Sequence, residues 1–239
     1  MKNIIVFGAS KGLGDALVKG LPEPGDNVWI VSRSRPDSLL INDGVHRSWI
    51  QADLSLLTAS SEIADVLENE TIDVLVYNVG IWEKEGFQDH YDFEQDDPTD
   101  IANLIQVNIT SAITCIQKLL PHMKNSDNGK IFLIGSTAGL ENTNHSQVSF
   151  VASKFGLRGI GNALREHVRK YSIGVTCINP GELAAEIPYE DGAEKAIDAY
   201  NGTRIPVQDI VSLVKCVANL SKVSCVKEIH IPAISDLNA

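Results

Sequence analysis

Short runs of apolar, mostly β-branched residues recur along the chain and alternate with longer stretches of helical spacing. The runs span residues 3–8, 27–32, 45–51, 72–77, 130–135, 173–178 and 226–231. Each run is nearly continuous in apolar residues, which predicts a strand that is buried on both faces. The stretches at residues 12–21, 55–70, 98–124, 147–171 and 207–220 repeat apolar positions every three or four residues and predict helices.

This alternation predicts the fold class. Strands that alternate with helices form βαβ units, and right-handed crossovers then leave helices on both faces of a parallel sheet. We therefore expect an α/β fold with a doubly wound parallel sheet of about seven strands. No internal repeat, low-complexity tract or Pro/Ser-rich linker interrupts the pattern, so we expect one domain over residues 1–239.

The charge balance limits the classes of partner. Lys and Arg number 20 against 31 Asp and Glu, which gives a formal net charge of −11. A field of this sign repels nucleic-acid phosphates and anionic membranes, so we expect neither as a partner. Acidic residues are densest at positions 83–100, and this run predicts a solvated loop that enters a helix near Pro98.

Cysteine, histidine and leader patterns bear on compartment and on metal chemistry. The four cysteines form no C-x-x-C pair and the six histidines no H-E-x-x-H motif, so we expect no metal site and no disulfide scaffold. The first apolar run ends before Lys11 and is too short for the core of a secretion signal. No run reaches the roughly 18 apolar residues of a membrane span. These patterns predict a cytoplasmic protein.

A glycine-rich turn joins the first predicted strand to the first predicted helix. It reads G-A-S-K-G-L-G at residues 8–14. Glycines at such a junction let backbone N–H groups approach an anion at a helix N-terminus. We therefore predict a dinucleotide pyrophosphate site at Gly8, Ser10, Lys11, Gly12, Leu13 and Gly14. The spacing is not the commoner G-x-G-x-x-G, so the position of the turn in the fold carries this inference.

The end of the second predicted strand favours NADP(H) over NAD(H). A carboxylate there would bind the ribose hydroxyls of NAD, but the sequence has Ser32-Arg33-Ser34-Arg35. A guanidinium pairs with a phosphate dianion through two charge-assisted hydrogen bonds, so Arg33 and Lys11 would bind the 2′-phosphate of NADP. The alternative is that Arg33 and Arg35 are ordinary surface cations.

Further motifs follow the glycine turn in a fixed order. They are Asp53-Leu54, Asn78-Val79-Gly80, Asn108, Ser136, Lys154 and Pro180-Gly181. Over essentially the whole chain, these motifs resemble the short-chain dehydrogenase/reductase family. The resemblance implies a Rossmann-like NADP-binding domain that interconverts a carbonyl and a secondary alcohol. It implies cofactor contacts at Asp53, Leu54, Asn78, Gly80, Lys154, Pro180, Gly181 and Leu183, and catalytic positions at Asn108, Ser136, Phe150 and Lys154.

The chain departs from the family at the position of the catalytic tyrosine. The family signature is Y-x-x-x-K, but Phe150 stands four residues before Lys154, and the longer Y-x6-K spacing would need tyrosine at Gln147. In the family, the tyrosine protonates the substrate oxygen, the serine hydrogen-bonds it, and the lysine binds the ribose and lowers the tyrosine pKa. The asparagine holds a water of the proton relay. Phenylalanine lacks the hydroxyl, so we expect impaired hydride transfer with cofactor binding retained.

Three explanations of Phe150 remain open. The chain is an engineered variant, a natural enzyme that recruits another acid, or a family member that has abandoned redox chemistry. Retention of Asn108, Ser136 and Lys154 favours an oxidoreductase scaffold with a disabled acid. His145 and Tyr189 are the nearest candidates for another acid, although a solvated histidine and a pocket-lining tyrosine explain them more simply.

The resemblance also implies a substrate-covering loop at residues 182–206. Apolar side chains in this loop and opposite it predict a small, fairly apolar carbonyl or alcohol substrate. They are Leu183, Ile187, Tyr189, Ile81, Trp82 and Leu140. The predicted helices at residues 98–124 and 147–171 look like those that pair across the family's dimer interface, so we expect a homodimer or homotetramer. The C-terminal end lacks the family's D-G-G segment, which leaves tetramer contacts open.

Two other functions stay open. One is a regulatory or interaction protein that binds NADPH without turning it over. The other is non-redox dehydration or isomerisation that uses Ser136 and Lys154. A Ser-His-Asp hydrolase is disfavoured because no G-x-S-x-G elbow surrounds Ser136.

Overall fold

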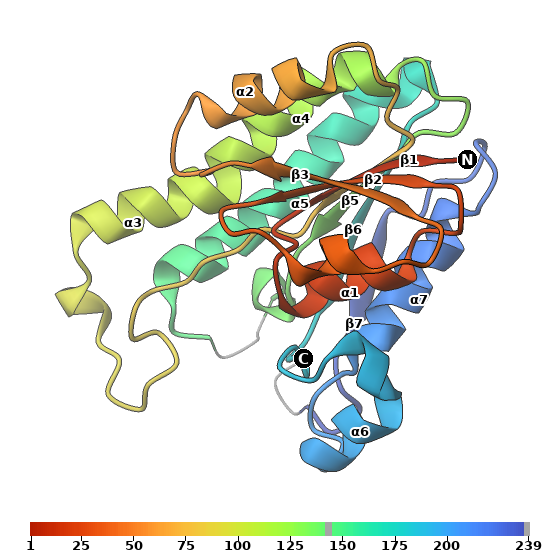
Figure 1. The fold of residues 1–239 in the computed structure, drawn as a ribbon. Coiled ribbons are helices and arrows are strands. Elements are labelled where there is room, and N and C mark those ends of the chain that lie inside the picture. The colour runs from red at the N-terminus through yellow and green to blue at the C-terminus, as the bar shows by residue number, and fades with distance from the viewer. Residues whose placement is uncertain (142–144, 237–239) are drawn as a thin grey trace.

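The computed structural model describes residues 1–141 and 145–236 and contains one seven-stranded sheet within them (Figure 1). The strands are β1 (Asn3–Phe7), β2 (Asn27–Ser32), β3 (His46–Gln51), β4 (Val74–Tyr77), β5 (Lys130–Ile134), β6 (Gly174–Pro180) and β7 (Glu228–Ile231). Their order is β3-β2-β1-β4-β5-β6-β7, and every neighbouring pair is parallel. The α/β fold with a doubly wound, Rossmann-like parallel sheet is confirmed. That residues 1–239 form one domain stays a prediction, and residues 142–144 and 237–239 lie outside the described part.

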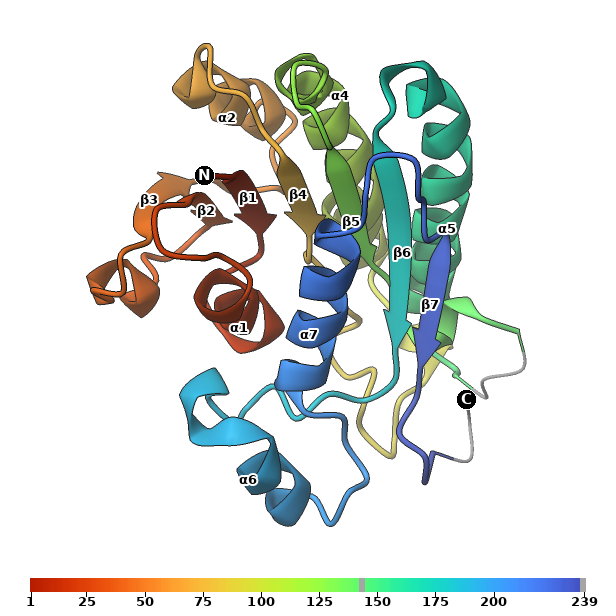
Figure 2. The same cartoon turned by 90° about the vertical axis from the view of Figure 1, so that its right-hand side faces the viewer.

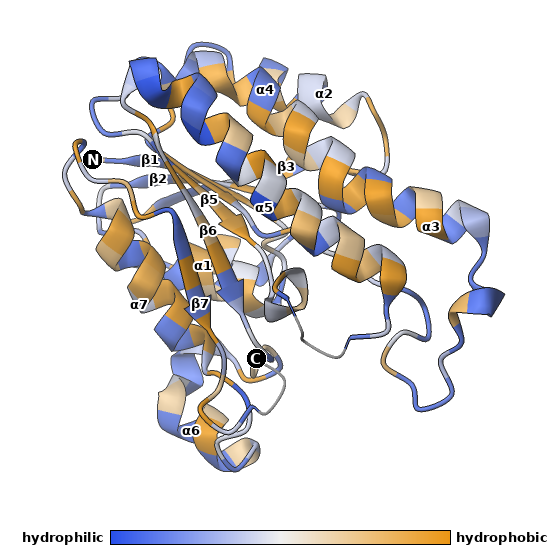
Figure 3. Ribbon diagram, turned by 180° about the vertical axis from the view of Figure 1, so that it is seen from behind, coloured by the Kyte–Doolittle hydropathy of each residue, from blue (hydrophilic) through white to orange (hydrophobic). Residues whose placement is uncertain are grey.

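Helices cover both faces of the sheet (Figures 2 and 3). They are α1 (Gly12–Gly20), α2 (Ala59–Leu67), α3 (Pro98–Ile105), α4 (Ser111–Met123), α5 (Val148–Val168), α6 (Gly192–Ala199) and α7 (Val207–Ala218). Helices α2, α4 and α5 bury their apolar residues on one face, and α1 and α7 on the other. Because successive side chains of a strand point to opposite faces, Ile5 of β1 joins the first core and Ile4 joins the second. The continuous apolar run of β1 thus serves two cores.

The two edge strands differ from the prediction that every strand is buried on both faces. In β3, His46, Ser48 and Gln51 are exposed, and β7 has no fully buried residue among its four. An edge strand has a neighbour on one side only, so its polar residues can face water. The prediction holds for the central strands and is wrong for these two.

The helix predicted at residues 98–124 is interrupted. A π-helical turn, Gln106–Thr110, lies between α3 and α4. The hydroxyls of Tyr77 and Ser111 both donate to the backbone carbonyl of Val107, at 2.9 Å and 2.6 Å. In a regular α-helix this carbonyl would accept a backbone N–H of the next turn. This widened turn contains Asn108. The sequence pattern also missed α6, which lies within the predicted substrate-covering loop.

The strand order reverses between β1 and β4. The chain leaves β1 toward β2 and β3 on one side, and leaves β4 toward β5, β6 and β7 on the other. In an open parallel sheet, this reversal produces a crevice outside the carboxyl ends of the strands, where ligands bind. Gly8 follows β1 and Asn78 follows β4, so both lie at that crevice.

Candidate functional site

A cavity of about 420 Å³ lies at the carboxyl ends of β1, β2 and β4. Eight of the predicted cofactor residues line it: Gly8, Ser10, Lys11, Arg33, Asp53, Leu54, Asn78 and Gly80. Lining residues that the sequence reasoning did not select include Ser34, Ser55, Asn103 and Val107. Asn103 and Val107 come from α3 and the π-helical turn. Only the tertiary packing brings these two beside the first strands, so no local pattern could have found them.

The glycine turn has the backbone that an anion site needs. Gly8 has φ +71° and Gly12 has φ +57°, which side chains other than glycine rarely tolerate. A Cβ on Gly14 would lie 2.2 Å from the carbonyl oxygen of Gly8, so a side chain there would force α1 away from the strand. No side chain caps the N-terminus of α1, and its first N–H groups stay available for a phosphate. The turn therefore fits a dinucleotide pyrophosphate.

The Leu13 side chain takes no part in that cavity. It is buried in the core between the sheet, α1 and α7. Its backbone lies in the first turn of α1. The structure therefore leaves its backbone N–H as the group that can contact the cofactor.

Arg33 and Lys11 share the cavity with Asp53. The Arg33 side chain is exposed at the end of β2, while Arg35 is not among the cavity-lining residues. The backbone N–H and the hydroxyl of Ser55 hydrogen-bond Asp53 and lower its pKa, with a smaller contribution from the charge of Arg33. The cavity thus offers two cations for a phosphate and one carboxylate as an acceptor.

Phe150 and Lys154 lie one turn apart on α5 and face the same side. Both are buried, and the Lys154 ammonium lies 5.4 Å from the centre of the Phe150 ring. Lys154 Nζ donates to the backbone carbonyl of Ile134 at 3.2 Å. It also lies 3.3 Å from the place where a Cβ of Gly80 would stand, so it sits directly behind the cavity wall. Burial lowers the pKa of Lys154 to about 8, because charge is costly away from water.

Ser136 stands directly before a short 3-10 helix, Thr137–Gly139 (η4), which follows β5. Its hydroxyl accepts a hydrogen bond from the backbone N–H of Ala138 at 3.1 Å and caps η4. Gly139 packs on α5 so closely that a Cβ there would lie 2.8 Å from the carbonyl carbon of Lys154. The missing side chain at Gly139 therefore lets the segment after β5, which begins with Ser136, pack closely on α5 at Lys154.

Asn108 is fully buried and holds three segments together. Its carboxamide oxygen accepts from the backbone N–H of Ile81 at 2.8 Å, and its nitrogen donates to the Ile81 carbonyl at 2.7 Å. The same nitrogen donates to the Ser153 hydroxyl at 3.0 Å. Asn108 thus joins the π-helical turn to the loop after β4 and to α5.

Glu83 is a site residue that the charge pattern missed. It belongs to the acidic run that predicts a solvated loop, but its side chain is buried. Its Oε1 accepts from the backbone N–H groups of Ser149 and Phe150, at 2.8 Å and 3.0 Å. The rest of the loop is mostly exposed, and α3 begins at Pro98 as predicted. A carboxylate on the first N–H groups of α5 fixes the helix end that carries Phe150.

Aromatic side chains cover the same helix end. Trp82 and Phe87 contact each other edge to face at 5.3 Å, and each lies 6.4 Å from the Phe150 ring. Both are more than half exposed, whereas Phe150 is buried. The loop after β4 therefore presents an apolar surface beside the position of the expected acid.

The family profile of the short chain dehydrogenases matches residues 2–195, which are most of the chain. The chain belongs to the short-chain dehydrogenase family. Members of this family are oxidoreductases, and the Rossmann-like sheet of this chain agrees with the family assignment.

Relatives of this short-chain dehydrogenase include proteins of different length. A 3-dehydrosphinganine reductase of Arabidopsis thaliana is 30% identical over 188 residues, which cover 75% of this chain and 54% of that protein. The chain therefore spans about half the length of that relative. An uncharacterized oxidoreductase of Staphylococcus epidermidis is 28% identical over 211 residues, which cover 84% of this chain and 86% of the relative.

Solved structures share the fold over nearly the whole chain. A short-chain dehydrogenase/reductase from Serratia marcescens has a TM-score of 0.81 at 23% identity and covers 100% of this chain and 98% of its own. A metagenomic short-chain oxidoreductase in complex with NADP has a TM-score of 0.75 at 26% identity, with 96% of each chain covered. A 3-oxoacyl-[acyl-carrier protein] reductase from Brucella melitensis in complex with NAD has a TM-score of 0.81 at 21% identity, with coverage of 97% and 96%.

Pro180, Gly181 and Leu183 lie at the same end of the sheet of this dehydrogenase but outside the cavity lining. Gly181 donates its N–H to the carbonyl of Ile231 at 3.0 Å, and Leu183 forms an isolated bridge with Ile205. The following loop returns to the glycine turn, where Ala185 lies in van der Waals range of the side-chain position of Gly12. The loop that follows Leu183 thus borders the phosphate-binding turn at Ala185.

The two candidate replacement acids lie elsewhere. The Tyr189 ring packs against Gly20 of α1, within the core on the opposite face of the sheet from α5. His145 is exposed and hydrogen-bonds Gln147 at 3.3 Å. The interpretation of Tyr189 as a substrate-pocket residue is wrong, because Gly20 leaves room for its ring beside α1.

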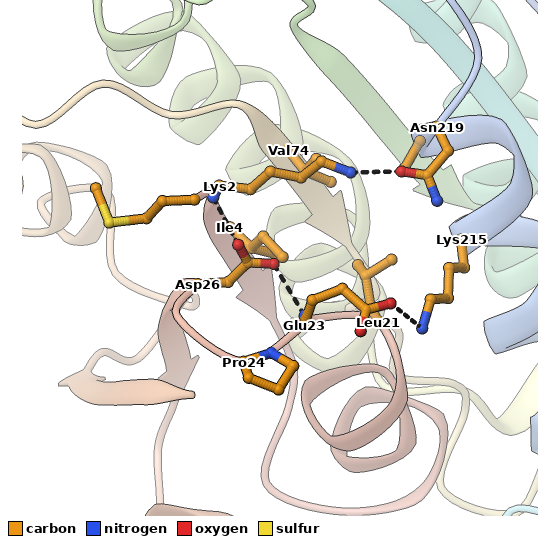
Figure 4. A pocket seen from close by; sticks show the side chains of 11 residues that line it. Lys2, Ile4, Leu21, Glu23, Pro24, Asp26, Val74, Lys215 and Asn219 are labelled. Carbon is orange, nitrogen blue, oxygen red and sulfur yellow. Dashed lines mark hydrogen bonds and ion pairs between the residues drawn. The ribbon is translucent and has the colours of Figure 1, made fainter. Parts of the chain in front are cut away.

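A second cavity, of about 240 Å³, lies at the opposite, amino ends of β1 and β4 (Figure 4). Its polar side chains are already paired with one another. Lys2 Nζ donates to Asn219 at 2.6 Å, Lys215 pairs with Glu23 at 2.7 Å, and Asp26 accepts from the backbone of Lys2. These contacts tie the end of α7 to the start of β1 and give this cavity a structural role.

The described residues contain neither a cluster of metal ligands nor a membrane-spanning helix. Across residues 1–141 and 145–236, His, Cys, Asp and Glu side chains form no group of three or more that could hold a metal ion. In the same part of the chain, no helix combines the length and apolar character needed to cross a membrane.

Proposed function

We propose that this dehydrogenase is an NADP(H)-dependent oxidoreductase that interconverts a carbonyl and a secondary alcohol on a small, fairly apolar substrate. The observation that carries the proposal is the placement of Lys154 directly behind Gly80 in the wall of the cavity that the glycine turn and Arg33 also line. The glycine turn and Lys154 would then contact the same cofactor. Proton transfer is weakened because Phe150 has no hydroxyl.

The preference for NADP(H) rests on Arg33 and Lys11. Both line the cavity at the end of β2 and in the glycine turn, where the adenosine phosphate would lie. Bound NADPH would supply the hydride. The metagenomic oxidoreductase in complex with NADP supports this preference, and the Brucella reductase in complex with NAD shows that the fold alone does not decide it.

The substrate class follows from the surface beside Phe150. The Ser136 hydroxyl would hydrogen-bond the reacting oxygen, while Trp82 and Phe87 would contact apolar parts of the substrate. Relatives named as 3-dehydrosphinganine reductase and 3-oxoacyl-[acyl-carrier-protein] reductase support a ketone as the reacting group.

The test compares NADPH consumption by the wild type and by Phe150→Tyr on one panel of ketones and aldehydes. Restoring a positioned acid should raise the rate by about 10²–10⁴-fold. The control is Phe93→Tyr, which adds the same hydroxyl to a half-exposed phenylalanine in the loop before α3 and should leave the rate unchanged. Equal rates for the wild type and Phe150→Tyr across the panel would contradict the proposal.

A second candidate function is an NADPH-binding regulatory or interaction protein. Phe150 is the observation that favours it, because this side chain removes the acid and leaves the cofactor cavity intact. Saturable NADPH binding without turnover by Phe150→Tyr would support this candidate. A cytoplasmic location also stays a prediction.

A further inference from the structure

The source of the proton is the open question for a short-chain dehydrogenase with Phe150. Where the family has a phenol, the described residues offer the ammonium of Lys154, which lies over the Phe150 ring at 5.4 Å. This group also lies 3.3 Å from the side-chain position of Gly80, a residue of the cavity wall. The Lys154 ammonium therefore lies close both to the Phe150 ring, which stands at the position of the family's phenol, and to the cavity wall at Gly80.

The Lys154 ammonium keeps unused donor capacity. An ammonium has three N–H donors, and within the described residues only the Ile134 carbonyl accepts from it, at 3.2 Å. No carboxylate of residues 1–141 or 145–236 forms an ion pair with it. The titratable group that acts on its charge is Cys177 on β6, and Arg158 of α5 acts on Cys177 in turn. Glu83 lies at the start of α5, where its Oε1 already accepts two backbone N–H groups.

Other ionisable donors are held elsewhere. The Tyr91 hydroxyl donates to Asp96 at 2.8 Å, and burial together with this bond raises the pKa of Tyr91 far above neutrality. Tyr189 packs beside α1, and His145 is exposed and bonded to Gln147. None of these three contacts the cavity wall behind which Lys154 lies.

We propose that Lys154 is itself the proton donor of this chain. As hydride from NADPH forms the new C–H bond at the carbonyl carbon, an N–H bond of the Lys154 ammonium breaks and its proton forms the O–H bond of the alcohol. The neutral amine that remains regains a proton from water before the next turnover. In the oxidation direction the amine accepts the proton of the alcohol. The proposal rests on the proposed function.

The acidity of the group suits this role. Burial lowers the pKa of Lys154 to about 8, so the ammonium predominates at neutral pH and yet gives up its proton far more easily than an exposed lysine. A donor is most effective when its pKa lies near the working pH.

The first test is the pH dependence of ketone reduction. We expect kcat/KM of the wild type to fall above about pH 8, as the ammonium is lost. Phe150→Tyr should be faster and should lose this limb, because a phenol then donates. Lys154→Arg keeps the positive charge but cannot release a proton near neutrality, so it should lower wild-type kcat by about 10²-fold or more while changing NADPH affinity by less than about tenfold. Lys118→Arg, on the exposed side of α4, is the matched control.

A second readout needs no turnover. In the protein without cofactor, the NMR signals of isotopically labelled lysines should include one that titrates near pH 8 and is absent from Lys154→Arg. Titration of that signal near the ordinary lysine value of about 10.4 would overturn the proposal.

The outcomes separate the two proposals. Turnover by Phe150→Tyr with none by the wild type would overturn the role of Lys154 and leave the proposed function standing. Full activity of Lys154→Arg in the wild-type background would do the same. If neither the wild type nor Phe150→Tyr turns over any ketone, both proposals fail.

Discussion

At the scale of single residues, Phe150 and Lys154 determine what this short-chain dehydrogenase can do. Their four-residue spacing on a helix places the ring and the ammonium on one side, which the sequence alone predicts. The consequence depends on burial. An aromatic face and one carbonyl replace water around the Lys154 charge, and this lowers its pKa to about 8.

The burial of Lys154 makes a prediction about stability and pH. Between about pH 8 and pH 10.5, the unfolded chain holds a proton that the folded chain lacks, so a rise in pH favours folding. Relative to Lys154→Met, the wild type should gain up to about 3 kcal/mol in free energy of unfolding across this range. Urea denaturation at several pH values measures it. Lys118→Met, at an exposed position, should show no such trend, and parallel curves for wild type and Lys154→Met would contradict the expectation.

Cofactor preference is a second residue-scale prediction. Arg33→Ala should weaken NADPH binding by about 10–100-fold, the worth of one or two charge-assisted hydrogen bonds, and leave NADH binding nearly unchanged. Arg35→Ala removes the same charge two residues away, outside the cavity lining, and should have little effect. Fluorescence titration with both nucleotides measures the ratio. Equal losses for the two variants would show that Arg33 acts only through net charge.

At the scale of elements, the first turn of α5 depends on a residue from a distant loop. Gln147, before the helix, provides no side-chain cap, and Glu83 supplies the acceptor for the N–H groups of Ser149 and Phe150. The side-chain amide of Gln147 donates to the backbone carbonyl of Gly86 in the same loop. The orientation of Phe150 and Lys154 is therefore set by contacts with residues 83–86.

This arrangement predicts the cost of removing Glu83. Glu83→Ala leaves two N–H groups at the α5 end without an acceptor and should lower the free energy of unfolding by about 1–2 kcal/mol. Glu83→Gln keeps an acceptor oxygen and should cost less. Glu85→Ala, at an exposed position two residues on, should stay within about 0.5 kcal/mol of the wild type. Chemical denaturation compares the three, and equal effects of Glu83→Ala and Glu85→Ala would rule out the capping role.

At the scale of the whole molecule, α4 and α5 cover one face of the sheet and expose apolar side chains. Ile113 of α4 is 48% exposed and Phe155 of α5 is 40% exposed. We propose that these helices form the interface of a homodimer, because a second copy would remove both side chains from water.

The dimer is tested by sedimentation. The wild type should sediment as a dimer or a larger assembly, and the double variant Ile113→Glu with Phe155→Glu should sediment as a monomer, because it places charges in the interface core. The matched control is Leu56→Glu with Leu57→Glu, two exposed apolar residues before α2. A wild-type monomer, or a dimer that survives the double variant, would contradict this interface.

The sequence by itself determined the fold and the cofactor turn of this protein. Continuous apolar runs and helical spacing are local patterns, so they predicted the seven strands, five helical stretches that contain every α-helix of the described residues except α6, and the doubly wound sheet. The glycine turn and the Phe150–Lys154 pair are also local, since their geometry depends on neighbours along the chain. The prediction was wrong about the burial of the two edge strands and about an uninterrupted helix over residues 98–124. Both features depend on residues that are distant in the sequence and adjacent in the folded structure.

Only the tertiary structure decided which distant groups meet. It buried Glu83 on the end of α5, placed Asn103 and Val107 on the cofactor cavity and packed Tyr189 against Gly20, away from Phe150. Charge and polarity along the chain predict exposure only on average. Whether one carboxylate is solvated or caps a helix depends on the N–H groups that folding brings to it, and those groups lie 66 and 67 residues away.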